Sequence, residues 1–140
     1  MAGTEDGQAR AAGNQPMVRF ENVCKQYGPL VVLDELDLDI AANEKVAIIG
    51  PSGSGKTTVL RMLMTLERID GGVIWVDGEP LTHMERNGKL VPADAKHVRR
   101  VRSKIGMVFQ SYALFPHMNA LRNCTEAPTT VLGLSRREAE

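Results

Sequence analysis

Residues 50–58, GPSGSGKTT, form the segment whose residue types are most clearly suited to binding a ligand. Glycines are spaced among proline and serines, and a lysine and two threonines follow. Glycine adopts backbone angles closed to other residues and carries no Cβ atom, so such a chain can wrap tightly with its amides pointing inward. Inward amides, together with the positive end of a following helix, bind anionic phosphate groups. The spacing matches G-x-x-x-x-G-K-[ST], and we therefore predict a phosphate-binding loop.

The side chains that end this loop have separate expected roles. We expect the Lys56 ammonium to lie between the outer phosphates of a nucleoside triphosphate and to act as a catalytic group. The Thr57 hydroxyl is expected to bind Mg²⁺, which prefers hard oxygen ligands, and Thr58 to hydrogen-bond an inner phosphate. The residues expected to hold the nucleotide in this loop are Gly50, Pro51, Ser52, Gly53, Ser54, Gly55, Lys56, Thr57 and Thr58.

Other interpretations of the loop stay open at this point. A flexible Gly/Ser linker that happens to contain Lys-Thr has a similar composition, but the flanking patterns of a strand and a helix favour the phosphate-binding loop. The motif specifies a nucleotide and not a reaction, because kinases, GTPases and motor ATPases share it. A non-catalytic protein that holds nucleotide without turnover is also consistent with it.

The overall composition excludes several classes of protein. The chain has 140 residues, 43% of them hydrophobic and 24% charged, and equal numbers of acidic and basic residues, which argues against global disorder and against a nucleic-acid coat. A basic run at residues 96–104 lacks interleaved aromatics and is interpreted as a solvated helix face. No apolar run reaches the ~18 to 20 residues of a membrane-spanning helix, so we expect no direct membrane insertion. The histidines and cysteines lack the spacing of a zinc site.

Period-two alternation and turn residues predict the elements that position the loop. Residues 1–15 are expected to be a flexible tail, and residues 16–140 to be one folded unit. Alternation predicts antiparallel strands at residues 18–27 and 31–40, joined by a turn at Gly28-Pro29. The apolar run at residues 45–49 predicts a strand buried on both faces of a sheet.

The rest of the chain alternates between further strands, helices and loops. We predict a helix at residues 57–66 ended by Gly71-Gly72, and a strand at residues 73–76 closed by an Asp77-Gly78 turn. The remaining expectations are a loop or insertion (79–95), a basic helix (97–103), a strand (105–109), an extended loop (111–128) and a helix beginning at Ser135 with Glu138 at its capping-box position.

Several of these segments together resemble a known family. The phosphate loop, Tyr27-Gly28, residues 104–110 (KIGMVFQ) and residues 114–117 (LFPH) resemble the ATP-binding subunits of ABC transporters, from Met17 onward. Other segments, at residues 63–67, 87–97 and 125–128, are similar to importers of polar amino acids, most like the ectoine/hydroxyectoine branch. The resemblance implies an α/β fold, an incomplete ABC-type nucleotide-binding domain of the P-loop NTPase class with an N-terminal antiparallel β portion.

The family also implies roles and partners. Tyr27 would stack on the adenine of ATP, and Gln110 would reach Mg²⁺ and the attacking water as a metal-binding and catalytic residue. Residues 111–123 would line a groove for a short helix of membrane-spanning permease subunits, with Leu114, Phe115 and Pro116 as apolar contacts. A second copy of the subunit would be a further partner, and nucleic acid would not. The protein would lie in the cytoplasm, on the inner face of the cell membrane through the permease.

The sequence also departs from the family. We find no acidic pair after a later strand, no glycine-rich signature and no downstream histidine; Asp77 is interpreted as a turn residue, and Arg136 and Arg137 stand where the signature would have glycines. Arg122 reverses a charge in the partner-facing loop. We therefore expect an N-terminal part of an importer ATPase that binds ATP and Mg²⁺ without efficient hydrolysis alone. An exposed apolar edge at residues 45–49 would make the isolated chain prone to aggregate.

Overall fold

The computed structural model describes residues 15–111 and 114–140 of the chain. The chain divides into two compact units, Met1–Gly106 and Met107–Glu140, and each is described by itself. Most of the tail expected at residues 1–15 lies outside the described residues.

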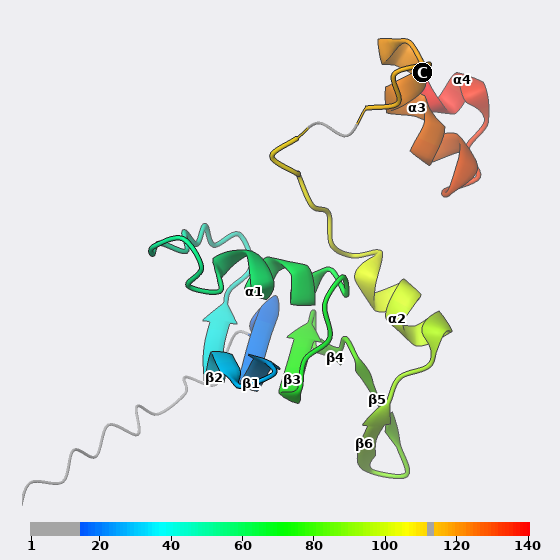
Figure 1. Cartoon of the computed structure of the whole chain (residues 1–140). Helices are drawn as coiled ribbons and strands as arrows, with labels where there is room; N and C mark the ends of the chain where they lie inside the picture. The colour runs from blue at the N-terminus through cyan, green and yellow to red at the C-terminus, as the bar shows by residue number, and fades with distance from the viewer. Residues whose placement is uncertain (1–14, 112–113) are drawn as a thin grey trace, which may run out of the picture. The chain divides into compact units, whose positions relative to one another are not determined.

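An antiparallel sheet forms the centre of the first unit (Figure 1). Its strand order is β2-β1-β3-β4, with β1 (Val18–Tyr27), β2 (Leu30–Ile40), β3 (Gly71–Val76) and β4 (Glu79–Pro80). The β1–β2 hairpin confirms the predicted strands and turn, with Tyr27 paired to Leu30 next to the turn. The strand predicted at residues 73–76 is confirmed as β3.

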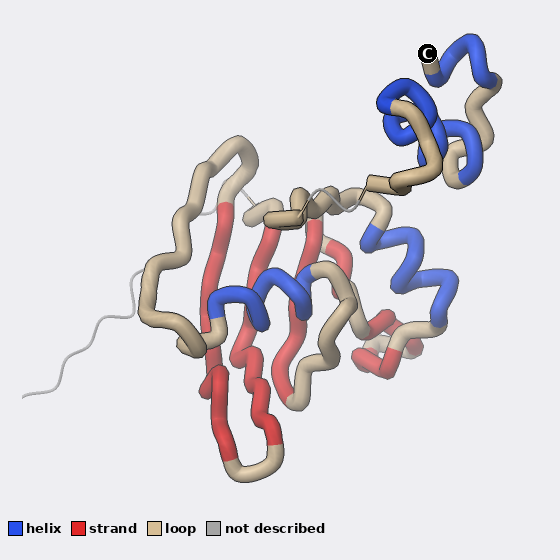
Figure 2. The backbone as a smooth tube through the Cα atoms, turned by 45° about the horizontal axis from the view of Figure 1, so that its top comes forward, coloured by secondary structure: helices blue, strands red, loops and turns tan. Residues whose placement is uncertain are grey.

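Helix α1 (Lys56–Leu63) packs on one face of this sheet. Figure 2 shows α1 crossing the strands, with a long loop leading from the end of β2 to its first residue. Val59 and Met62 of α1 are buried in one apolar cluster with Phe20 of β1 and Ile74 of β3, and this burial removes apolar surface from water. The predicted helix is confirmed, but it ends at Leu63, and the two glycines expected to end it open β3 instead.

The strands predicted at residues 45–49 and 105–109 are wrong, because neither segment has regular secondary structure. A strand needs a neighbour that pairs with its backbone N–H and C=O groups, and the described residues provide none for either run. Apolar side chains consequently remain open to solvent: Ile49 is 91% exposed and Val108 97% exposed.

Residues 79–95 were expected to be a loop or an insertion, and the loop alternative is wrong. It contains β4 and a two-stranded hairpin, β5 (His83–Arg86) with β6 (Lys89–Pro92). Asn87 and Gly88 form its turn with positive φ of 54° and 72°, the geometry that a two-residue hairpin of this type requires. The polar composition of the segment suggested a loop, whereas the Asn-Gly dipeptide is typical of the turn between two short paired strands.

Helix α2 (Ala95–Arg102) confirms the predicted basic helix and begins two residues earlier than expected. Asp94 caps it, because the Asp94 carboxylate accepts a hydrogen bond from the backbone N–H of His97 at 2.7 Å. Val101 is fully buried in the apolar cluster, so one side of the helix belongs to the core. Lys104, just beyond the helix, binds Asp77 at 2.7 Å and Glu79 at 2.9 Å.

The second unit contains α3 (Ala120–Thr130) and α4 (Arg136–Ala139). The extended loop predicted at residues 111–128 is therefore wrong over its second half. Asn119 caps α3 by accepting from the N–H of Arg122 at 2.8 Å, and Pro128, which suggested a loop, lies in the last turn of the helix. The predicted start of a helix at Ser135 is confirmed, with its capping box to Glu138. Across residues 15–111 and 114–140, none of the helices combines the length and the apolar character that a bilayer span needs.

Candidate phosphate-binding site

Two glycines give the loop at residues 50–55 its shape. Gly53 and Gly55 have φ of 83° and 87°, in the left-handed region that glycine enters without a steric penalty. Gly55 also lies tightly against β2, since a Cβ atom on it would be 3.0 Å from Cγ1 of Val32 and 3.4 Å from Cδ2 of Leu33. The loop therefore packs against β2 and leads directly into the first residue of α1.

The first turn of α1 presents backbone N–H groups without a side-chain cap. Its N-cap residue is Gly55, which has no side chain that could accept a hydrogen bond from these groups. By contrast, Asp94 caps α2 and Asn119 caps α3. Uncapped amides at the positive end of a helix dipole form an anion-binding position, so this helix start can accept a phosphate group.

Lys56 folds back over the loop. Its Nζ donates hydrogen bonds to the backbone oxygens of Gly50 at 2.8 Å and Pro51 at 2.6 Å, and it lies 3.5 Å from the Oγ of Ser54. These contacts hold a positive charge beside the uncapped amides of α1. A phosphate group bound at this helix start would compete with the two carbonyl oxygens for the ammonium.

The other polar residues of the loop are accessible. Ser52, Ser54 and Thr57 are exposed and Thr58 is half-buried, so their hydroxyl groups are open to a ligand. A cleft of about 400 Å³ next to the loop is lined mainly by apolar side chains of β2 and by residues 46–49. Hydroxyls, backbone amides and an ammonium are the groups that bind polyphosphate and Mg²⁺, and in the lining of this cleft the charge and the hydroxyl come from Lys56 and Ser54 of the loop itself.

Tyr27 ends β1 within the same unit, and 44% of it is exposed. The register of the hairpin relates this end of β1 to the phosphate loop. Leu33, against which Gly55 packs, pairs with Lys25, two residues before Tyr27. The predicted adenine-stacking residue therefore lies on β1, and the predicted phosphate loop packs on β2, the strand paired with it.

Gln110 belongs to the Met107–Glu140 unit, where it is exposed. The assignment of Gln110 to Mg²⁺ and water stays a prediction. Leu114 and Phe115 are exposed, as a docking surface would require. Sequence reasoning missed Asn123, which fixes this turn by accepting from the N–H of Phe115 at 2.8 Å.

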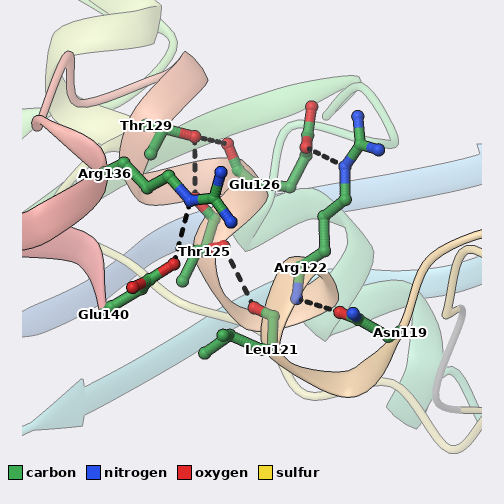
Figure 3. A pocket seen from close by; sticks show the side chains of 8 residues that line it. All are labelled: Asn119, Leu121, Arg122, Thr125, Glu126, Thr129, Arg136 and Glu140. Atoms are coloured by element: carbon green, nitrogen blue, oxygen red, sulfur yellow. Dashed lines mark hydrogen bonds and ion pairs between the residues drawn. The ribbon is translucent and has the colours of Figure 1, made fainter.

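A hollow of about 570 Å³ lies beside α3 and α4 in the second unit (Figure 3). Its charged side chains form pairs within the unit, Arg122 with Glu126 at 3.7 Å and Arg136 with Glu140 at 2.9 Å. Arg136 is the first residue of α4 and directly follows its N-cap residue, Ser135. Because its charges are matched internally, this hollow is a weaker candidate for a polyanion than the loop.

Asp77 lies in the turn between β3 and β4, as interpreted from the sequence. Its φ is 50°, Gly78 follows with φ of 73°, and its carboxylate accepts a hydrogen bond from Lys104. The carboxylate is therefore engaged in holding this turn.

Comparisons with known proteins point to one family. The sequence model of the ABC transporter family matches residues 33–140. A probable amino-acid ABC transporter ATP-binding protein of Sinorhizobium fredii is 57% identical over 123 residues, which cover 88% of this chain and 48% of the relative. The glutamine transport ATP-binding protein of Escherichia coli is 44% identical over 124 residues, which cover 89% of this chain and 48% of the relative.

A solved structure extends the agreement to the fold. The dimeric structure of a bacterial ABC transporter cassette matches with a TM-score of 0.63 at 31% identity, over 79% of this chain and 46% of that one. The chain spans about half the length of the curated relatives it matches. The described residues thus contain part of the fold of an ABC nucleotide-binding domain, including its phosphate loop and its antiparallel sheet. The chain belongs to the ABC transporter family of ATP-binding proteins.

Proposed function

We propose that this chain binds Mg-ATP at residues 50–58 and serves as the ATP-binding part of an importer. The observation that carries the proposal is the convergence of three features at one point: glycines with positive φ, the uncapped start of α1, and the Lys56 ammonium. Each feature favours an anion, and together they form a cradle for a polyphosphate.

Different residues of this chain would bind different parts of Mg-ATP. The amides of the loop and of the first turn of α1 would hold the phosphates, and Lys56 would exchange its carbonyl partners for the outer phosphate oxygens. Thr57 would supply one oxygen to Mg²⁺, Thr58 would bind an inner phosphate, and Tyr27 would stack on adenine. Mg²⁺, when bound, neutralises charge on the outer phosphates. We further propose that Gln110 contributes to the metal and water position.

The proposed partners are membrane-spanning permease subunits and a second copy of the ATP-binding subunit. Support comes from the family and from relatives whose names describe amino-acid transport. On this proposal the chain acts on the cytoplasmic face of the cell membrane, held there by the permease. The cargo we propose is a polar amino acid or a compatible solute such as ectoine, supported by the resemblance of residues 63–67, 87–97 and 125–128.

We expect the purified chain to bind Mg-ATP without steady turnover. Asp77, which follows the short apolar strand β3, is engaged with Lys104 in a turn, and within residues 15–111 and 114–140 we propose no carboxylate for polarising the attacking water. Phosphate release would be followed with excess Mg-ATP, beside a Lys56→Ala variant to subtract contaminating ATPase. Background-level release from both proteins supports the proposal, and steady release that disappears in Lys56→Ala contradicts the absence of turnover.

A further inference from the structure

Lys25, a buried lysine on β1, makes contacts that have no role in the nucleotide binding proposed above. Lys25 is only 6% exposed, an unusual environment for a lysine. Its Nζ lies 3.2 Å from the Glu67 carboxylate and 3.5 Å from the Asp70 carboxylate, so the buried charge is matched by two acids. Both acids belong to the segment between α1 and β3, on the far side of α1 from the phosphate loop.

The same ammonium lies over the ring of Tyr27, 4.8 Å from its centroid. This is cation–π geometry, and a desolvated pair of this kind is stronger than an exposed one. The pKa of the Glu67 carboxylate is lowered, with Lys25 as the first cause and the Tyr27 side chain as a further one. Lys25 therefore contacts the Tyr27 ring at one face and is itself held by Glu67 and Asp70.

Backbone contacts make this arrangement rigid. The Asp70 carboxylate accepts from the N–H of Gln26 at 2.8 Å, and the N–H of Asp70 donates to the oxygen of Cys24 at 3.0 Å. The N–H of Gln26 is the main cause that lowers the pKa of Asp70. Burial lowers the pKa of Lys25, but the two acids outweigh burial and raise it. The lysine and Asp70 are thus charged throughout the neutral range.

We infer that Lys25 is a positioning residue for base recognition: it holds the Tyr27 ring in place from one face, so that the exposed part of the ring can receive adenine. This inference rests on the proposed function, because it requires adenine at Tyr27. Lys25 does not touch the nucleotide itself. It acts by restricting the tyrosine and by linking the end of β1 to the segment that follows α1, the helix that starts at the phosphate loop.

The test compares two ligands that share the phosphates and differ in the base. The affinities of the 140-residue chain for Mg-ATP and for Mg-tripolyphosphate would be measured by calorimetry with Lys25→Met, which keeps the stem and removes the charge. We expect Lys25→Met to weaken Mg-ATP binding about 3- to 10-fold, the range of one cation–π contact, and to leave the tripolyphosphate affinity within about 2-fold. Lys104→Met is the matched control, since Lys104 also bridges two acids, Asp77 and Glu79, and both affinities should stay unchanged.

A second variant and a double-mutant cycle keep the inference testable if Lys25→Met folds poorly. Glu67→Gln preserves the shape of the acid and weakens its hold on Lys25, so it should lower the affinity for Mg-ATP and not that for Mg-tripolyphosphate. In a Tyr27→Ala background, neither change should have a further effect, because Lys25 acts through the ring. Equal losses for both ligands, or a loss that persists without Tyr27, would overturn the inference. An unmodified chain that binds neither ligand would instead overturn the proposed function.

Discussion

Replacing Lys56 with alanine is expected to weaken Mg-ATP binding by about 10- to 100-fold, the range of one or two charge-assisted hydrogen bonds. The ammonium of Lys56 already lies at the loop, 2.8 Å from the Gly50 oxygen and 2.6 Å from the Pro51 oxygen. A phosphate at the start of α1 would meet this charge without a large movement of the chain. Calorimetric titration of both proteins with Mg-ATP measures the difference.

Lys45→Ala is the control for this experiment, because Lys45 is exposed, precedes the loop and lies outside the residues proposed to bind the nucleotide. It should keep the affinity of the unmodified chain. Equal losses in the two variants would mean that overall charge, and not the position of Lys56, attracts the nucleotide. An unchanged affinity in Lys56→Ala would remove Lys56 from the site.

Gly55→Ala should abolish measurable Mg-ATP binding and also destabilise the fold. The new methyl group would sit in a left-handed conformation, with φ of 87°, at a cost of roughly 1–2 kcal/mol. It would also meet Cγ1 of Val32 at 3.0 Å, so the Val32 side chain or the loop must give by a few tenths of an ångström. A shift here moves the first amides of α1, on which phosphate binding depends. Urea unfolding and Mg-ATP titration would report the two losses separately.

Gly88→Ala is the control that separates the cost of a positive φ from the cost of the contact with Val32. Gly88 has φ of 72° in the β5–β6 turn, and a Cβ atom there would have no heavy atom within 4 Å. This variant should therefore lose only the conformational part of the stability and keep its affinity for Mg-ATP. If both variants lose the same free energy of unfolding and both still bind, the packing of Gly55 on β2 has no role in the site.

The loop could be predicted from sequence because its information is local. Glycine spacing, the lysine and the following helix all lie within a few residues, and the observed positive φ of Gly53 and Gly55 follows from those residue types. The β1–β2 hairpin was predictable for a similar reason, since its strands are adjacent and alternate clearly. Capping at Ser135 also depends on residues only three positions apart.

The strand predictions at residues 45–49 and 105–109 were wrong because a strand depends on residues that are distant in sequence. Residues 45–49 and 105–109 have strand composition, but a strand exists only where a neighbour pairs with it, and composition says nothing about the neighbour. The role of Lys25 was invisible for the same reason. Its partners Glu67 and Asp70 lie more than forty positions away in sequence, and only the fold brings them to the end of β1. Pro128 misled in the opposite direction: a proline disfavours the interior of a helix, yet α3 contains Pro128 and continues to Thr130.

The most direct test of the central claim is an amide NMR titration of the folded chain with Mg-ATP. The loop hypothesis predicts the largest shifts for the N–H groups of residues 50–58 and smaller ones near Tyr27, because the phosphates bind backbone amides. A folded chain whose spectrum does not change, or whose shifts fall away from the loop and the start of α1, would contradict the claim that this segment binds the nucleotide.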